Sequence, residues 1–350
     1  MHVLFGPAIG LMNRLKYPQK FLLISLLFAL PLAFVLYHLN SSIGDNMDIA
    51  RKEIQGNAYL RPCLALMRDV AQEKRLARQV LAGRGGTRAA VLAEDARVAA
   101  DLRAVSAVEA RLGETLQTQA QFAALRDSAH SLHAGLGQGT VGDSDAAHDK
   151  VTAAVQALIS RVGDTSTLIL DPDLDTYYTM DTTLLRVPEA VDLLAQAQTF
   201  GADVMDKPVL TPDQKARALV LSGLIRSNND AMHNSTVRAF ANNPLGNLKP
   251  RLSGLVQTCL ATRAAPLQTL VRKADDPAGT RPAPAAWTAS LDPALAASFA
   301  YWDRATDELD VDLKARLDRY EAERRLAFGF AFAMLLVVAY LYVAFYLAVM

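Results

Sequence analysis

Residues 21–39 read FLLISLLFALPLAFVLYHL and contain no Asp, Glu, Lys or Arg. As a helix that rises about 1.5 Å per residue, this stretch nearly matches the hydrocarbon thickness of a bilayer. Residues 326–350, LAFGFAFAMLLVVAYLYVAFYLAVM, are equally uncharged, and their aromatic side chains gather toward the C-terminal end. Each stretch predicts a transmembrane helix. A cleaved signal peptide is disfavoured, because the first stretch is too long and begins well inside the chain.

Basic residues set the expected orientation of these spans. Three of them precede the first span: Arg14, Lys16 and Lys20. Because cytoplasmic flanks carry an excess of Lys and Arg, we expect residues 1–20 in the cytoplasm and residues 40–325 outside it. Arg324 and Arg325 lie on the outer side of the second span and oppose this orientation mildly. The prediction is a multi-pass protein of the lipid bilayer with one large external region.

Composition narrows the class of protein. The chain has 36 basic and 36 acidic residues, so its net charge of zero gives no electrostatic reason to expect nucleic-acid binding. Only 7% of the residues are aromatic, which suits helices better than sheets. Cys63 and Cys259 form no metal-type cluster, and their spacing does not decide whether they pair. Two small buried apolar residues are the favoured interpretation.

Helical periodicity recurs between the two spans, and no segment alternates as a strand does. Apolar residues recur at spacings of three and four; the first of them are Ile43, Met47, Ala50 and Ile54. Breaks rich in glycine or proline divide the region into seven expected helices. These begin near residues 40, 87, 146, 172, 211, 247 and 292. Thr211 is a good N-cap, because Pro212 follows at the first helical position.

The predicted fold is therefore all-α, with two transmembrane helices flanking an extracytoplasmic antiparallel helical bundle. Long predicted helices combine with short ones, so we expect two stacked bundle modules, one near the membrane and one distal to it. Long apolar stripes also favour a homodimer.

The string LILDPDLDTYYTMD, residues 168–181, allows several interpretations. Asp171 can cap a helix whose first turn contains Pro172, and Asp173 and Asp175 suit the positive end of a helix dipole. The alternating aspartates also resemble the opening of a calcium loop, although the glycine and the final Glu of such a loop are missing. Capping is the favoured interpretation.

Other residues of this string combine aromatic rings with hydrogen-bond acceptors on about one helical turn. Tyr177, Tyr178 and Asp181 could thus line a small-molecule pocket. Asn228 falls on the apolar seam of the helix that begins at Thr211. Such an Asn either fixes the packing register or contacts a ligand.

Four residues recur along one side of the first external helix: Tyr59, Arg61, Arg68 and Arg75. A solvated face commonly has this composition. An organic-acid sensor would need such arginines, because the guanidinium group binds carboxylates bidentately. These four residues, together with Tyr177, Tyr178, Asp181 and Asn228, are the candidate ligand-binding residues.

Signatures of enzymes are missing from the sequence. It contains no phosphate-binding GxxxxGK[ST], no GxSxG nucleophile turn and no HExxH motif. The six histidines show no metal-ligand spacing. We therefore expect neither catalysis nor a cofactor nor a bound metal.

The arrangement resembles the N-terminal sensory half of bacterial methyl-accepting chemotaxis proteins. The resemblance is carried by GPAIGLMNRLKYPQKF (6–21), by NAYLRPCLALMRDVAQEKR (57–75), by residues 168–181 and by a helix that enters the second span. It implies a periplasmic sensor domain in the inner membrane that binds a small ligand, such as an organic or amino acid. The ligand would cause a helix shift that crosses the membrane.

Similar input regions occur on histidine kinases and diguanylate cyclases, and a ligand-free membrane scaffold is a further alternative. Chemotaxis receptors continue after the second span into a HAMP domain and a long cytoplasmic coiled coil. Neither is present in residues 1–350. We therefore expect the output machinery to lie beyond this sequence or on a partner, or to have been lost.

Overall fold

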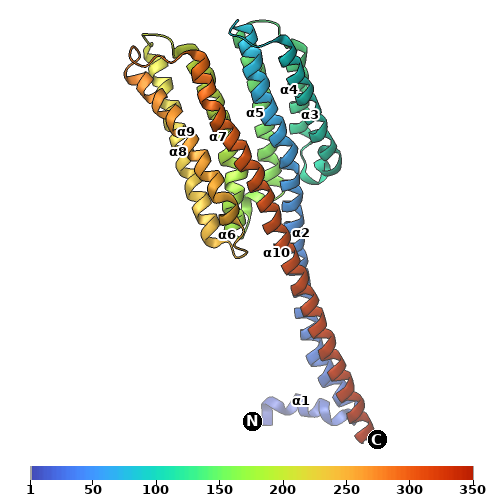
Figure 1. The fold of residues 1–350 in the computed structure, drawn as a ribbon. Helices are drawn as coiled ribbons and strands as arrows, with labels where there is room; N and C mark the ends of the chain where they lie inside the picture. Colours follow the sequence, from blue (N-terminus) through green and yellow to red (C-terminus); the bar gives the residue numbers. More distant parts are fainter. Residues whose placement is uncertain (1, 350) are drawn as a thin grey trace. The chain divides into compact units, whose positions relative to one another are not determined.

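The computed structural model describes residues 2–349, and in this range every regular element is helical (Figure 1). Met1 and Met350, which end the predicted cytoplasmic segment and the predicted second span, lie outside the described residues. The chain divides into two compact units. One combines residues 1–51 with 315–350, and the other is Lys52–Lys314. The all-helical class expected from the sequence is thus confirmed.

The first unit contains the two apolar stretches. Helix α1, His2–Arg14, precedes helix α2, Tyr17–Leu81, which is 65 residues long. Helix α10, Pro284–Val349, extends over 66 residues to the end of the described chain. Both long helices contain a segment that is long and apolar enough to cross a membrane, and no part of either segment is buried. Two candidate membrane spans therefore flank a central helical domain.

The second unit begins with a group of four helices on the right of Figure 1. It consists of the Lys52–Leu81 part of α2, α3 (Arg88–Leu116), α4 (Gln119–Gly135) and α5 (Val141–Thr165). Its core is aliphatic and includes Leu60, Met67, Val105, Leu125, Leu132, Val155 and Leu158. Each of these helices thus buries one apolar stripe, as the periodicity predicts.

The prediction of one helix from residue 87 to 134 is wrong, because the chain turns at Gln117 and Thr118. Gln117 adopts a left-handed conformation with φ of 50°. Its amide donates to the carbonyl of Glu114, and the amide of Thr118 donates to that of Gly113. These bonds close the C-terminus of α3 without a glycine at the left-handed position.

Short helical segments link this group to the next one. A 3₁₀ turn, Leu168–Leu170, is followed by α6 (Leu174–Met180), a π-helical segment (Asp181–Arg186) and α7 (Val187–Val204). The predicted interruption at Asp171 is thus confirmed. A single π-helical segment often lies at a functional or strained position.

The second group consists of α7, α8 (Pro212–Asn242), α9 (Leu248–Asp275) and the first part of α10. Thr211 caps α8 as expected: its hydroxyl accepts from the amide of Gln214, whose side chain accepts from the amide of Thr211. α10 begins at Pro284, earlier than the predicted start near Asp292, and Pro293 lies inside it. A proline inside a helix removes one backbone hydrogen bond, and α10 continues past this position.

A buried lysine connects the segments that follow α7 and α9. The side chain of Lys273 on α9 is fully buried, and its ammonium group donates to four backbone carbonyls. These belong to Met205, Lys207, Pro277 and Thr280. The ammonium thereby satisfies carbonyl groups that the ends of α7 and α9 would leave unpaired.

The two groups lie side by side along α2 and α10, so the expected end-to-end stacking is wrong. The side-chain amide of Asn57 on α2 donates to the carbonyl of Thr306 on α10 at 2.9 Å, and Arg61 pairs with Asp307. Nearer the start of α10, residues of both helices line shared cavities. Helices α3, α8 and α9 have similar lengths of 29, 31 and 28 residues, which suits helices that lie side by side.

Candidate functional site

The structure places the predicted residue Tyr59 in the core. Its side chain has no exposed surface, and its hydroxyl donates to Oε2 of Glu109 on α3 at 2.6 Å. Burial, followed by the bond to Glu109, raises the pKa of this phenol well above its usual range. The hydroxyl of Thr118 donates to the same carboxylate oxygen at 2.6 Å. Tyr59 therefore holds α2 against α3 and the turn that follows.

The three predicted arginines of α2 have different surroundings. Arg61 pairs with Asp307 on α10. Arg68 donates through Nε to Oδ1 of its neighbour Asp69 at 2.9 Å. The Nε of Arg75 donates to Oε1 of Gln72 at 3.2 Å. Of the three, Arg75 is the one whose described hydrogen bond leaves its guanidinium without a carboxylate.

The predicted residues Asp181 and Asn228 belong to one hydrogen-bonded cluster. Asp181 accepts from the hydroxyl of Ser235 at 2.6 Å and from Nε of Arg186 at 3.1 Å. The amide of Asn228 donates to the carbonyl of Arg186 and to Oε2 of Glu189. The cluster joins α7 and the π-helical segment to α8, as the register interpretation of Asn228 predicts.

The two predicted tyrosines contact each other and Arg238 on α8. Tyr177 and Tyr178 contact each other edge to face, with ring centroids 5.2 Å apart. The hydroxyl of Tyr178 accepts from Arg238, whose guanidinium lies over the same ring. The favoured capping interpretation of Asp171 is wrong, because α6 begins at Leu174, Asp173 stands at its N-cap position and Pro172 precedes the helix. Asp171 instead accepts from the amide of Asp173 and the hydroxyl of Thr176.

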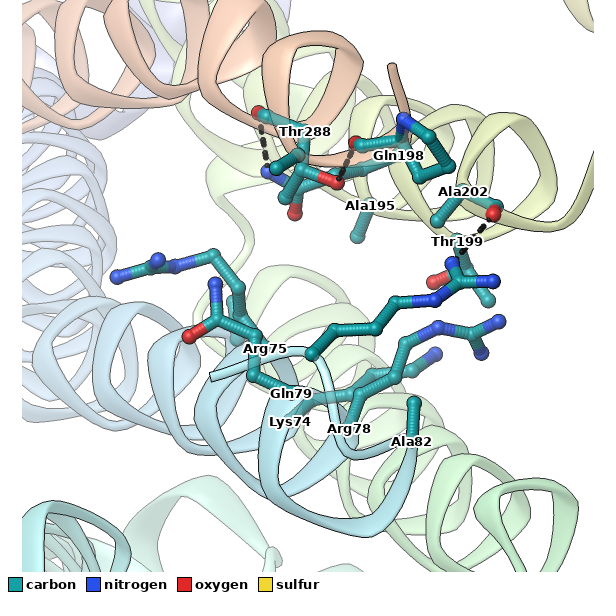
Figure 2. Close-up of a pocket in the computed structure, with 14 residues that line it drawn as sticks. Lys74, Arg75, Arg78, Gln79, Ala82, Ala195, Gln198, Thr199, Ala202 and Thr288 are labelled. Atoms are coloured by element: carbon teal, nitrogen blue, oxygen red, sulfur yellow. Dashed lines mark hydrogen bonds between the residues drawn. The ribbon is translucent and has the colours of Figure 1, made fainter. Parts of the chain in front are cut away.

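A cavity of about 60 Å³ lies between α2, α7 and α10 (Figure 2). In Figure 2, the labelled residues of α2 face those of α7 and α10 across it. Four of the lining residues are basic: Lys74, Arg75, Arg78 and Arg84. None is acidic, so this basic cavity has the composition of an anion-binding site.

Two of the four cations pair with carboxylates of α5 and α7 that do not line the cavity. Arg78 pairs with Asp145 on α5 and with Asp203 on α7. The ammonium of Lys74, which is almost fully buried, pairs with Asp149 at 2.5 Å.

The other two cations retain donors for a ligand. The Nη1 of Arg84 donates to the carbonyl of Ala202 at 2.7 Å, and Arg75 donates to Gln72 through Nε. Both contacts use neutral acceptors, so each guanidinium keeps its charge and several of its N–H groups. Arg84 is exposed, whereas Arg75 is partly buried.

A larger cavity of about 650 Å³ adjoins the basic cavity and shares Ala71, Arg75 and Gln198 with it. It is lined by α2, α3, α7 and α10 and mixes charged groups with apolar ones. The charged groups are Arg68, Asp69, Arg75, Glu94, Arg97, Asp292 and Asp303. Its volume falls in the range of small-molecule sites.

Carboxylates near the α3 wall of the larger cavity have altered proton affinities. Burial raises the pKa of Glu94. Burial, followed by the charge of Asp69, raises the pKa of Asp101 to about 6. These groups lie where few water molecules can solvate them, a frequent property of binding sites.

Of the eight predicted residues, Arg68 and Arg75 line these cavities. Sequence reasoning missed Lys74, Arg78, Arg84, Gln198 and Asp292. One usable signal was the EKRLAR segment (73–78), which places three cations within about one turn of helix. Gln198 and Asp292 carried no such signal, because they enter the site only through packing between distant helices.

The chain matches no protein-family model, no curated protein and no solved structure. It is an all-helical protein with two candidate membrane spans and a cavity between the helices of its central domain.

Proposed function

We propose that the chain is the input region of a membrane-bound receptor of the chemotaxis type, which binds a small solute and carries out no chemistry. One observation carries the proposal: the basic cavity lies between α2 and α10, and these two helices also contain the candidate membrane spans. A solute in this position touches both helices that lead to the bilayer.

The mechanism follows from helix packing. A ligand can shift an equilibrium only by its differential affinity for the two states. Residues Pro284–Thr288 of α10 face residues 71–79 of α2 across the cavity, so a ligand that contacts both walls favours one spacing. Small displacements of packed helices, of about 1–2 Å, are an established means of signal transfer.

The compartment and assembly belong to the same proposal. The basic residues before the first span favour an N-terminus in the cytoplasm, which leaves the cavity in the periplasm of a bacterial inner membrane. A homodimer would couple two copies of α10. A histidine kinase or a diguanylate cyclase could receive the same signal in place of a chemotaxis output.

The proposal is tested on the full chain in lipid nanodiscs. Thermal unfolding is measured with a panel of organic acids, amino acids, amines and sugars, and we expect at least one to raise the midpoint in a saturable manner. A panel without any stabilising solute would favour the ligand-free scaffold.

Transmission is tested in a fusion of the chain to a receptor output. Gly-Gly inserted after Ala322 interrupts α10 and should abolish the response while ligand binding persists. An unchanged response would contradict transmission through this helix.

A further inference from the structure

The two adjoining cavities carry opposite charges at their unshared ends. Arg75 and Gln198 line both, so the cavities meet at these two side chains. From there the basic cavity extends toward Arg84 and the larger one toward Asp303, and Asp292, which is bonded to Gln198, lies next to the junction. A ligand that occupies both cavities would have basic side chains near one of its ends and carboxylates near the other.

At the basic end, the geometry leaves two guanidinium groups for an anionic group. Arg78 and Lys74 are already paired with carboxylates. Arg75 and Arg84 contact only neutral acceptors in their described bonds. Their planar N–H groups match the two oxygens of a carboxylate.

At the other end, the charged residues sort into pairs and a remainder. Arg68 pairs with Asp69, and Arg97 pairs with Glu94 at 2.7 Å. Asp292 accepts at 3.1 Å from Nε2 of Gln198, a neutral donor, and this nitrogen also donates to the carbonyl of Thr288. Within residues 2–349, no ion pair of Asp292 is described.

Apolar side chains also line the larger cavity. Leu64 on α2 and Leu295 and Phe299 on α10 line the larger cavity. Phe299 is buried, whereas Leu295 is partly exposed. These side chains offer a surface to an aliphatic or aromatic group, as in most small-molecule sites.

We propose that the two cavities form one site for a small zwitterion with an apolar body. Its carboxylate binds Arg75, its ammonium group binds Asp292, and its body packs on Leu295 and Phe299. Gln198 orients the carboxylate of Asp292 and separates the two charged ends. This inference rests on the proposed sensing function and adds the class of ligand.

The test uses matched trios of compounds with the full chain in nanodiscs. Each trio contains a zwitterion, the acid that lacks its ammonium group and the amine that lacks its carboxylate; leucine, 4-methylpentanoate and 3-methylbutylamine are one such trio. Trios based on the other natural amino acids and on γ-aminobutyrate complete the panel. We expect at least one zwitterion to bind tenfold or more tightly than both of its analogues.

Two variants assign the ends of the site. Arg75→Gln and Asp292→Asn should each weaken binding of that zwitterion by about tenfold or more, because each removes one charge-assisted contact. Asp292→Asn should not weaken the binding of the matched acid, whereas a general loss of folding would weaken it. Arg126→Gln, on the exposed face of α4, is the control and should change neither.

The outcomes separate this inference from the proposed function. If an acid binds as tightly as its zwitterion, or if Asp292→Asn has no effect, the zwitterion site is wrong and ligand sensing remains. The same holds if only sugars or amines bind. If no compound of either panel binds, both proposals fail.

Discussion

Gly201→Ala tests whether α7 and α10 pack as closely as the structure has them. A Cβ atom at Gly201 would lie 2.0 Å from Nε1 and 2.3 Å from Cε2 of Trp287. Trp287 is among the largest fully buried side chains, and its indole N–H donates to the carbonyl of Ala197 at 3.1 Å. The indole ring must therefore move by more than 1 Å (roughly, from ordinary carbon contacts of 3.5–4 Å) and lose this bond.

The cost follows from three opposing terms. Overpacking a core by one methyl group costs about 1–3 kcal/mol, and the lost hydrogen bond costs about 1 kcal/mol. Alanine returns about 1 kcal/mol, because it is the better helix former. The free energy of unfolding should fall by about 1–3 kcal/mol. A domain of this size loses about 2–4 °C of midpoint per kcal/mol, so we expect a decrease of roughly 2–12 °C.

The assay is thermal unfolding of the full chain in detergent, followed by circular dichroism and by tryptophan fluorescence. The chain has two tryptophans, so a Trp302→Phe background makes Trp287 the single reporter. Gly223→Ala is the matched control: Gly223 lies exposed on α8, and the methyl group of an alanine there would meet open space. The control should gain up to about 1 kcal/mol. A Gly201→Ala midpoint equal to that of the parent would refute the close packing.

Three further predictions concern other parts of the central domain. Lys273→Met leaves buried carbonyls unpaired, so the free energy of unfolding should fall by about 2–4 kcal/mol. Proteolysis of the loop after α7 should become faster, and an unchanged rate would contradict the role of Lys273 in holding this loop. Burial, and then the charge of Asp175, raises the pKa of Asp312 to about 7. The folded state therefore binds the proton more tightly, so stability should rise as the pH falls from about 7 toward 4, and the contribution of Asp312 should level off above about pH 7. Asp312→Asn should flatten this part of the midpoint-versus-pH curve, and a curve of unchanged slope would exclude Asp312 as its source. Thr167 adopts φ of 67°, which a β-branched residue rarely does, so Thr167→Gly should raise stability by about 1 kcal/mol; a lower midpoint would mean that its side-chain contacts outweigh the strain.

Local signals in the sequence predicted the helices well where a specific side chain marks a boundary. The capping box at Thr211 is such a signal, and the structure has it as expected. The end of α3 lacks one, because Gln117 adopts the left-handed conformation that glycine usually supplies. The predicted single helix from 87 to 134 was wrong for this reason. Apolar periodicity alone does not reveal a turn between two helices.

The site was predicted less well than the fold, because it depends on contacts between helices about 200 residues apart in the chain. Periodicity on α2 marks which face carries Arg61, Arg68 and Arg75 but not what each one meets. Arg61 meets Asp307 and becomes part of an ion pair, whereas Arg75 faces a cavity. The lateral arrangement of the two helix groups decides between these outcomes, and the sequence favoured end-to-end stacking.

The same lateral arrangement constrains how a ligand could act under the proposed function. Nearer the candidate membrane spans along α2 and α10, the side-chain amide of Asn57 donates to the carbonyl of Thr306 in a fully buried contact. Sliding α10 along α2 by 1–2 Å (roughly the usual size of such shifts) would break this bond and leave the buried side-chain amide of Asn57 without this acceptor. A tilt of α10 about Thr306 keeps the bond and still changes the spacing at Pro284–Thr288. Because the tilt avoids that cost, we favour it over sliding as the movement that a bound ligand would bias.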